Sequence, residues 1–169
     1  MRTFTPAAAA IFAVGAALAA ELPDYISVQH ATVLSRWLRT ISTTRVLTDR
    51  DRACDDEIAK LRKGDGPAYP SLRNYHPYYA VGDFNFDGIE DFAVVAIDVN
   101  QKRLLAIFNG PLAHRSSPSY LSSDSEGALF YFKGRSKREP LLVGPFESEG
   151  GSLEPREDGT YTYLENDCC

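Results

Sequence analysis

The chain has 169 residues, of which 44% are hydrophobic and 24% are charged. This composition is typical of a globular protein and excludes a mainly disordered one. The 23 acidic residues outnumber the 18 basic residues, giving a formal net charge of −5 at pH 7. This balance argues against a nucleic-acid-binding protein, which needs clustered Lys and Arg.

Residues 1–19 have the pattern of a secretory signal peptide. Arg2 supplies a short positive region, Ala7 to Leu18 is a small and apolar run, and Ala17-Leu18-Ala19 provides an A-x-A cleavage site. The run is too short to span a bilayer, so we expect no membrane span. An uncleaved anchor is the alternative. Residues 20–169 are long enough for one domain, which we expect to be secreted or periplasmic.

Two amphipathic helices are predicted next. The first covers Ser27 to Ile41, and the second covers Asp49 to Lys63, with Thr48 as N-cap and Gly64 as C-cap. The apolar stripe of the first helix consists of Leu34, Trp37, Leu38 and Ile41, and that of the second consists of Ala53, Cys54, Ile58 and Leu61.

A β-hairpin is predicted from Tyr78 to Val99, which reads YYAVGDFNFDGIEDFAVVAIDV. Both ends of this stretch are rich in strand-forming residues, and its centre is rich in turn-forming Asp, Asn and Gly. A Gly-, Pro- and Tyr-rich loop, Gly64 to Pro77, leads into it.

The centre of the hairpin has the spacing of a calcium-binding loop. Oxygen-bearing side chains stand at its positions one, three, five and nine, and Gly88 stands at position six, where the chain must turn sharply. Calcium takes six to eight oxygen ligands, and a backbone carbonyl at position seven and water would complete the shell. A turn that binds no metal is the alternative. The predicted Ca²⁺ ligands are Asp83, Asn85, Asp87, Ile89 and Asp91.

This loop resembles the single repeat of the FG-GAP or integrin-α family, in which D-x-N-x-D-G-x-x-D joins two strands. Gly82 before the loop and Phe92-Ala93-Val94 after it also match that pattern. An EF-hand would instead place an acidic residue at position twelve, which here is Val94. The resemblance covers about twenty of the 169 residues and implies calcium binding. It does not imply the family's propeller, because one copy is too short for that fold.

The second half of the chain alternates strands and turns. Strands are predicted at Arg103 to Phe108, Gly127 to Lys133, Pro140 to Gly144 and Thr160 to Leu164, with a long exposed loop from Pro111 to Glu126. Because helices come first and strands follow, we predict an α+β fold in which N-terminal helices pack on one antiparallel β-sheet, with the calcium loop joining two strands.

The three cysteines predict one disulfide bond. In an exported protein Cys54 is expected to pair with Cys168 or Cys169, because adjacent cysteines rarely bridge each other. The remaining thiol is free or forms an intermolecular disulfide. A zinc site is a weaker reading, since three sulfurs have no nearby fourth ligand.

Two functions from different classes remain open. The first is an exported, calcium-stabilised binding module for a protein or a glycan, without a catalytic site of its own. The second is a small extracytoplasmic hydrolase with structural or catalytic calcium. His30, His76 and His114 lie in no recognisable nucleophile motif, but the members of a catalytic triad can come from any part of a chain.

The N-terminal pattern makes a direct prediction. The protein isolated from its host should begin at Ala20 or Glu21 and be found in an extracytoplasmic fraction. Intact-mass measurement checks this expectation, and a protein that retains Met1 and is confined to the cytoplasm would contradict it.

Overall fold

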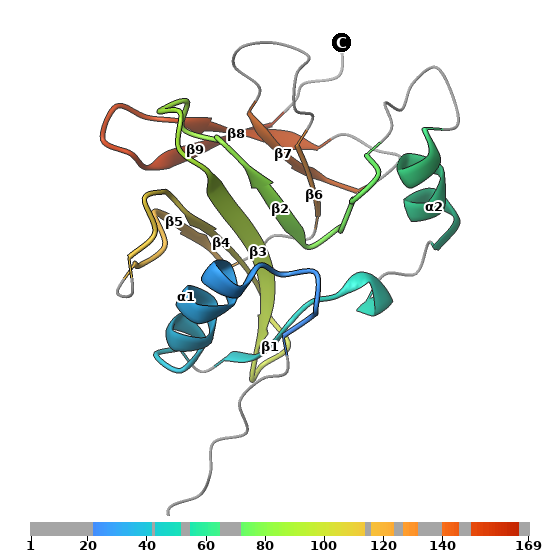
Figure 1. The fold of residues 1–169 in the computed structure, drawn as a ribbon, viewed down its shortest axis with the longest axis horizontal. Helices are drawn as coiled ribbons and strands as arrows, with labels where there is room; N and C mark the ends of the chain where they lie inside the picture. Colours follow the sequence, from blue (N-terminus) through green and yellow to red (C-terminus); the bar gives the residue numbers. More distant parts are fainter. Residues whose placement is uncertain are drawn as a thin grey trace, which may run out of the picture.

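The computed structural model describes residues 22–41, 43–51, 55–64, 72–113, 116–123, 127–131, 140–145 and 150–165. These ranges contain nine strands in two antiparallel sheets and two short α-helices (Figure 1). The predicted α+β fold, with helices on one sheet, is therefore wrong, and the chain is β-rich. The predicted signal peptide, the three cysteines and His114 lie outside the described residues.

The first sheet has the order β1-β3-β4-β5, and β2 also pairs with β3. The second sheet has the order β6-β7-β8-β9. The strands of the first sheet are β1 (Thr43–Val46), β2 (Tyr79–Gly82), β3 (Asp91–Asp98), β4 (Arg103–Phe108) and β5 (Tyr120–Ser122). Those of the second sheet are β6 (Ala128–Phe130), β7 (Leu141–Gly144), β8 (Gly151–Pro155) and β9 (Tyr161–Glu165).

Strand β3 is the centre of the first sheet. One of its edges pairs with β4 along most of its length, and the other edge is shared by two strands. Its first half pairs with β2, and its second half pairs with β1. At the junction, the Val95 N–H donates to the Tyr78 carbonyl at 3.0 Å, and the Val95 carbonyl accepts from the Leu47 N–H at 2.9 Å. The hairpin predicted around the loop is thus the pair β2–β3.

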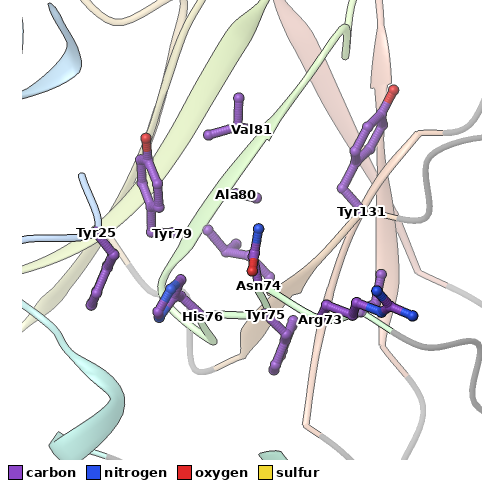
Figure 2. A pocket seen from close by; sticks show the side chains of 11 residues that line it. Tyr25, Arg73, Asn74, Tyr75, His76, Tyr79, Ala80, Val81 and Tyr131 are labelled. Atoms are coloured by element: carbon purple, nitrogen blue, oxygen red, sulfur yellow. The ribbon is translucent and has the colours of Figure 1, made fainter. Parts of the chain in front are cut away.

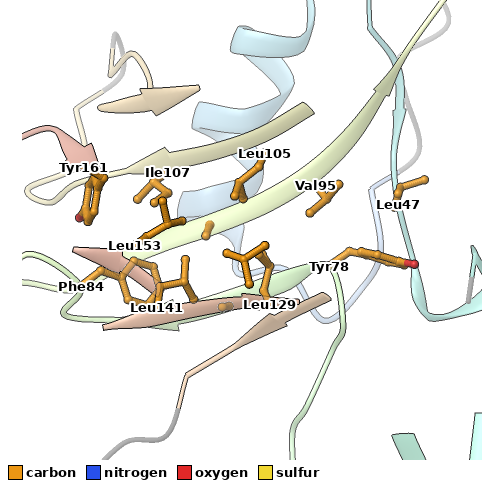
Figure 3. Packing of buried hydrophobic residues seen from close by; sticks show 13 residues of the cluster. Leu47, Tyr78, Phe84, Val95, Leu105, Ile107, Leu129, Leu141, Leu153 and Tyr161 are labelled. Carbon is orange, nitrogen blue, oxygen red and sulfur yellow. The ribbon is translucent and has the colours of Figure 1, made fainter. Parts of the chain in front are cut away.

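Both faces of β3 are buried. Phe92, Val94 and Ala96 face the cluster that includes α1 (Val28–Leu38), whereas Ala93 and Val95 face the second sheet. Figure 3 shows the inter-sheet core, in which Ile107 and Leu105 of the first sheet meet Leu153, Leu141 and Leu129 of the second. The unbroken apolar run of β3 fits burial on both faces. A strand with one solvent-exposed face would instead alternate apolar and polar residues.

The first predicted helix is confirmed as α1. Its N-cap is Ser27, whose side-chain oxygen accepts from the His30 N–H at 3.2 Å. Helix α1 lies against the outer face of the first sheet (Figure 1). Its buried stripe packs there, and Trp37 meets Phe108 edge-on. No helix among the described residues is long and apolar enough to cross a membrane.

The second predicted helix begins later than expected. Asp49–Asp51 form a separate 3₁₀ turn, and the α-helix α2 covers Asp55–Lys63. The Asp51 carboxylate accepts from the Thr48 N–H at 2.7 Å, and this local bond closes the turn. The end was predicted correctly, since Gly64 has a φ of +74° and its N–H bonds the Lys60 carbonyl.

Strands β1, β5 and β8 were not predicted. Strand β5 lies inside the stretch expected to be an exposed loop, and β8 lies in a segment that reads as turns. These strands have three to five residues, too few to show a clear period of two. They form strands because they pair with neighbouring strands, and their own sequences do not reveal this.

Double burial of the first sheet can be tested by truncating one side chain on each face. Phe92→Ala and Ile107→Ala should each lower the free energy of unfolding by about 3 kcal/mol, because both side chains are fully buried. Val99→Ala is the control, since Val99 is 59% exposed. Urea unfolding checks these values, and an Ile107→Ala cost as small as that of the control would contradict the two-sheet core.

Candidate functional site

The loop between β2 and β3, residues 83–90, turns through two residues of left-handed backbone. Gly88 has a φ of +85°, and nothing lies within 4 Å of where its Cβ would be. Phe86 also has a positive φ, of +65°. Glycine is therefore favoured at position six because of its backbone conformation and not because space is short. Left-handed backbone is unfavourable for residues with a Cβ.

Three of the predicted ligand side chains lie together in this loop. The two Asp83 carboxylate oxygens accept from the N–H groups of Asp87 at 3.0 Å and Gly88 at 2.9 Å. The Asn85 carbonyl oxygen also accepts from the Asp87 N–H at 3.1 Å, and its amide donates to Asp87 Oδ2 at 2.9 Å. The Asp87 Oδ1 atom accepts from the Ile89 N–H at 2.8 Å. The backbone thus wraps around a group of side-chain oxygens.

Asp91 differs from these residues because it is fully buried, with 0% exposure. Its Oδ2 accepts from the N–H groups of Phe84 at 2.8 Å and Asn85 at 3.2 Å, and its Oδ1 accepts from the Gly110 N–H at 2.8 Å. Burial raises the pKa of the Asp91 carboxyl, and the three N–H donors oppose that shift. This carboxylate holds both the start of the loop and the residue pair that follows β4.

The donor set fits a calcium ion. The side-chain oxygens of Asp83, Asn85 and Asp87 each accept one N–H bond, and an oxygen with two lone pairs can accept a second partner. Hard carboxylate and amide oxygens are the ligands that calcium prefers. Among the described residues, no group of three or more His, Cys, Asp or Glu side chains is close enough to hold a metal. The fit therefore depends on the Asn85 amide oxygen, and the ligand roles of Ile89 and Asp91 stay predictions.

A tyrosine of the second sheet contacts the segment after β4, next to Gly110, whose N–H bonds Asp91. The Tyr161 hydroxyl donates to the Asn109 side-chain carbonyl at 2.8 Å, and the Asn109 amide donates to the Gly159 carbonyl at 3.0 Å. Burial raises the pKa of Tyr161, and the charges of Asp91, Asp87 and Asp83 raise it further.

His30 connects α1 to the same hairpin. Its ring stacks on Phe92 with centroids 4.3 Å apart, and its Nδ1 lies 2.7 Å from the Tyr79 hydroxyl. Its Nε2 lies 3.7 Å from a carboxylate oxygen of the exposed Glu90. Burial lowers the pKa of His30, and Glu90 opposes that shift. These contacts are those of a packed core histidine with satisfied ring nitrogens.

His76 belongs to an ion-pair cluster that local sequence did not reveal. Its Nδ1 lies 3.0 Å from Asp49 Oδ1, and the Arg62 guanidinium pairs with the same carboxylate. Arg62 also donates to the Tyr75 carbonyl at 2.7 Å, so the cluster holds the segment before β2. The three residues are 13 or more positions apart in the chain, and no sequence motif joins them. The described hydrogen-bond partners of the His76 ring are Asp49 and Arg62, and the Tyr25 ring stacks on it.

Next to this cluster lies a groove of about 790 Å³. Figure 2 shows Tyr25, His76 and Tyr79 on one side of β2 and Tyr131 on the other. Its lining is mainly aromatic and apolar, with polar groups from one short segment. The lining residues are Tyr25, Leu72, Arg73, Asn74, Tyr75, His76, Tyr79, Ala80, Val81, Leu129 and Tyr131. Sequence reasoning missed this groove, because its residues come from four separate segments.

Comparison with known proteins adds no identification. No protein-family model, curated protein or solved structure matches this chain at a significant level.

The structural role of Asp91 can be tested without any metal. In calcium-free buffer, Asp91→Asn should lower the free energy of unfolding by about 1–3 kcal/mol, because its new amide N–H₂ would face backbone N–H donors in a buried site. Glu90→Gln is the matched control, since the Glu90 side chain is 67% exposed. Equal midpoints for the two variants in urea would contradict this role.

Proposed function

We propose that this protein is an exported binding module that calcium stabilises. The observation that carries the proposal is the group of oxygens from Asp83, Asn85 and Asp87, gathered at the tip of the β2–β3 hairpin. The Ile89 carbonyl and Asp91 complete the proposed ligand set. Bound calcium would supply positive charge that offsets the mutual repulsion of the loop carboxylates.

The position of the loop supports a stabilising role. It joins two strands of the first sheet, and its last residue, Asp91, is the first residue of the central strand β3. Through Asn109 and Tyr161 the same region contacts the second sheet. An ion bound at this place would favour the folded state, because the unfolded chain does not hold these oxygens together.

A binding role has more support than hydrolysis. The described residues that line the open groove carry aromatic rings, an arginine and an asparagine, but no carboxylate. His76 is held by Asp49 and Arg62, and its ring faces Tyr25 rather than a nucleophile. Aromatic and amide side chains of this kind provide contact area and hydrogen bonds for recognition.

Calcium should raise the melting temperature of the mature protein. At a calcium concentration ten times the dissociation constant, linkage adds about 1.4 kcal/mol to the free energy of unfolding. Asp87→Ala should abolish this response, and magnesium should replace calcium poorly, because it requires a tighter octahedral shell. Calorimetric titration and thermal melts with calcium, magnesium and chelator measure these effects.

Asp98→Ala is the matched control for Asp87→Ala. Asp98 lies at the other end of β3, where its carboxylate accepts from the N–H groups of Asn100 and Lys102 in an ordinary turn. This variant should keep the full calcium response even if its stability falls. Absence of both binding heat and a thermal shift at millimolar calcium in the unaltered protein would overturn the proposal.

A further inference from the structure

The groove beside β2 follows the edge of that strand. It is lined by Tyr79, Ala80 and Val81, which are consecutive in β2. Successive side chains of a strand point to opposite faces, and here Ala80 packs in the inter-sheet core while Tyr79 and Val81 pack in the cluster with α1. A groove that touches all three residues therefore runs along the strand edge and not over one face.

The register of β2 shows which backbone groups face this groove. Because the Val95 N–H bonds the Tyr78 carbonyl, Ala80 and Gly82 direct their hydrogen-bonding groups toward β3. The backbone N–H and carbonyl groups of Tyr79 and Val81 then point away from β3. The Tyr79 N–H bonds the His76 carbonyl at 3.2 Å. The Tyr79 carbonyl and both backbone groups of Val81 have no partner within the part of the chain that the structure describes.

The groove exists because the two sheets separate beside β2. At the start of β2 they are joined by a backbone bond, in which the Leu129 N–H donates to the Pro77 carbonyl at 2.8 Å. Farther along, the Tyr131 ring packs on Gly82 so closely that a Cβ there would lie 2.2 Å from it. Glycine at position 82 therefore permits the close approach that places an aromatic wall opposite β2.

This edge is short, but it lacks charge and proline, two of the features that protect free strand edges. Tyr79, Ala80, Val81 and Gly82 include no charge and no proline, although charged residues and proline commonly prevent an edge from pairing with other chains. The groove walls instead offer aromatic surface. The Tyr25 ring stacks on His76 with centroids 3.6 Å apart, and the Tyr25 hydroxyl is buried without a hydrogen-bond partner among the described residues.

The charge of the groove indicates the kind of partner. Arg73 is exposed at its rim, and none of the described lining residues carries a carboxylate. The Asp49 carboxylate, which contacts the lining residue His76, is already paired with Arg62. A partner with an acidic side chain would complement Arg73.

We infer that this groove binds an extended acidic segment of a partner polypeptide, which adds to the free edge of β2 as a further strand. The inference rests on the proposed binding function and names its partner class. Main-chain bonds to Val81 and Tyr79 would supply affinity, and alternate side chains of the segment would enter the aromatic groove. Because such a strand has a period of two, every second residue of the segment should matter.

The test uses a random heptapeptide library displayed on phage and selected against the full mature chain in calcium. Selected peptides are synthesised, and their affinities are measured by fluorescence anisotropy. Val81→Pro should weaken binding about tenfold, because it removes one outward N–H. It leaves the bonds to β3 intact, since Val81 contributes none of them. Val81→Ala retains the N–H and should change the affinity less than threefold, about the effect of a small lost apolar contact.

A second variant keeps the inference testable if Val81→Pro does not fold. Arg73→Glu changes an exposed side chain and should weaken acidic peptides while leaving the melting temperature unchanged. N-methylation along a selected peptide should reduce affinity at alternating positions. Equal affinity of folded Val81→Pro and Val81→Ala, or uniform effects of N-methylation, would overturn strand addition.

The same experiment separates this inference from the proposed function. If calcium stabilises the protein but the library yields no binding peptide, or an array of saccharides yields the only binders, strand addition is wrong and the calcium module stands. If selected peptides bind through Val81 with and without calcium, and calcium has no thermal effect, the inference stands and the calcium proposal is wrong.

Discussion

The buried carboxylate of Asp91 is the interaction on which the hairpin depends. It lies at the first position of the central strand and accepts backbone N–H groups from Phe84, Asn85 and Gly110. A charged group without exposure is costly unless it is hydrogen-bonded, and here the chain supplies three donors. The cost of burial is thereby offset, and the start of the loop and the end of β4 are held in one place. The oxygens of Asp83, Asn85 and Asp87 gather on this support.

Strand β3 connects the loop to both layers of the fold. Because α1 covers one of its faces and the second sheet covers the other, its position fixes both layers. Its shared edge also explains the groove, since β2 pairs with only the first half of β3. Among the described residues, the other side of β2 has no strand partner and lines the groove. The loop of residues 83–90 and the groove therefore both depend on this short strand.

Sequence reasoning found the elements with strong local signals. The stripe containing Leu34 and Trp37 revealed α1, and the Asp, Asn and Gly spacing revealed the loop with its left-handed Gly88. It failed where structure depends on distant partners. The strand β3 was predicted, but the second sheet that covers one of its faces consists of strands of three to five residues. Likewise His76 looked isolated, because Asp49 and Arg62 meet it only after folding. The free backbone groups of Val81 follow from register, which a single sequence does not specify.

Amide hydrogen exchange of the calcium-free protein tests the central claim most directly. If Asp91 organises the loop by itself, the N–H groups of Phe84 and Gly110 will exchange as slowly as those of the β3–β4 ladder before any calcium is added. Addition of calcium will then slow the amides of Asp87 and Gly88 at the loop tip. Rapid exchange of Phe84 and Gly110 in the calcium-free protein, at the rate of an exposed turn amide, would contradict the account.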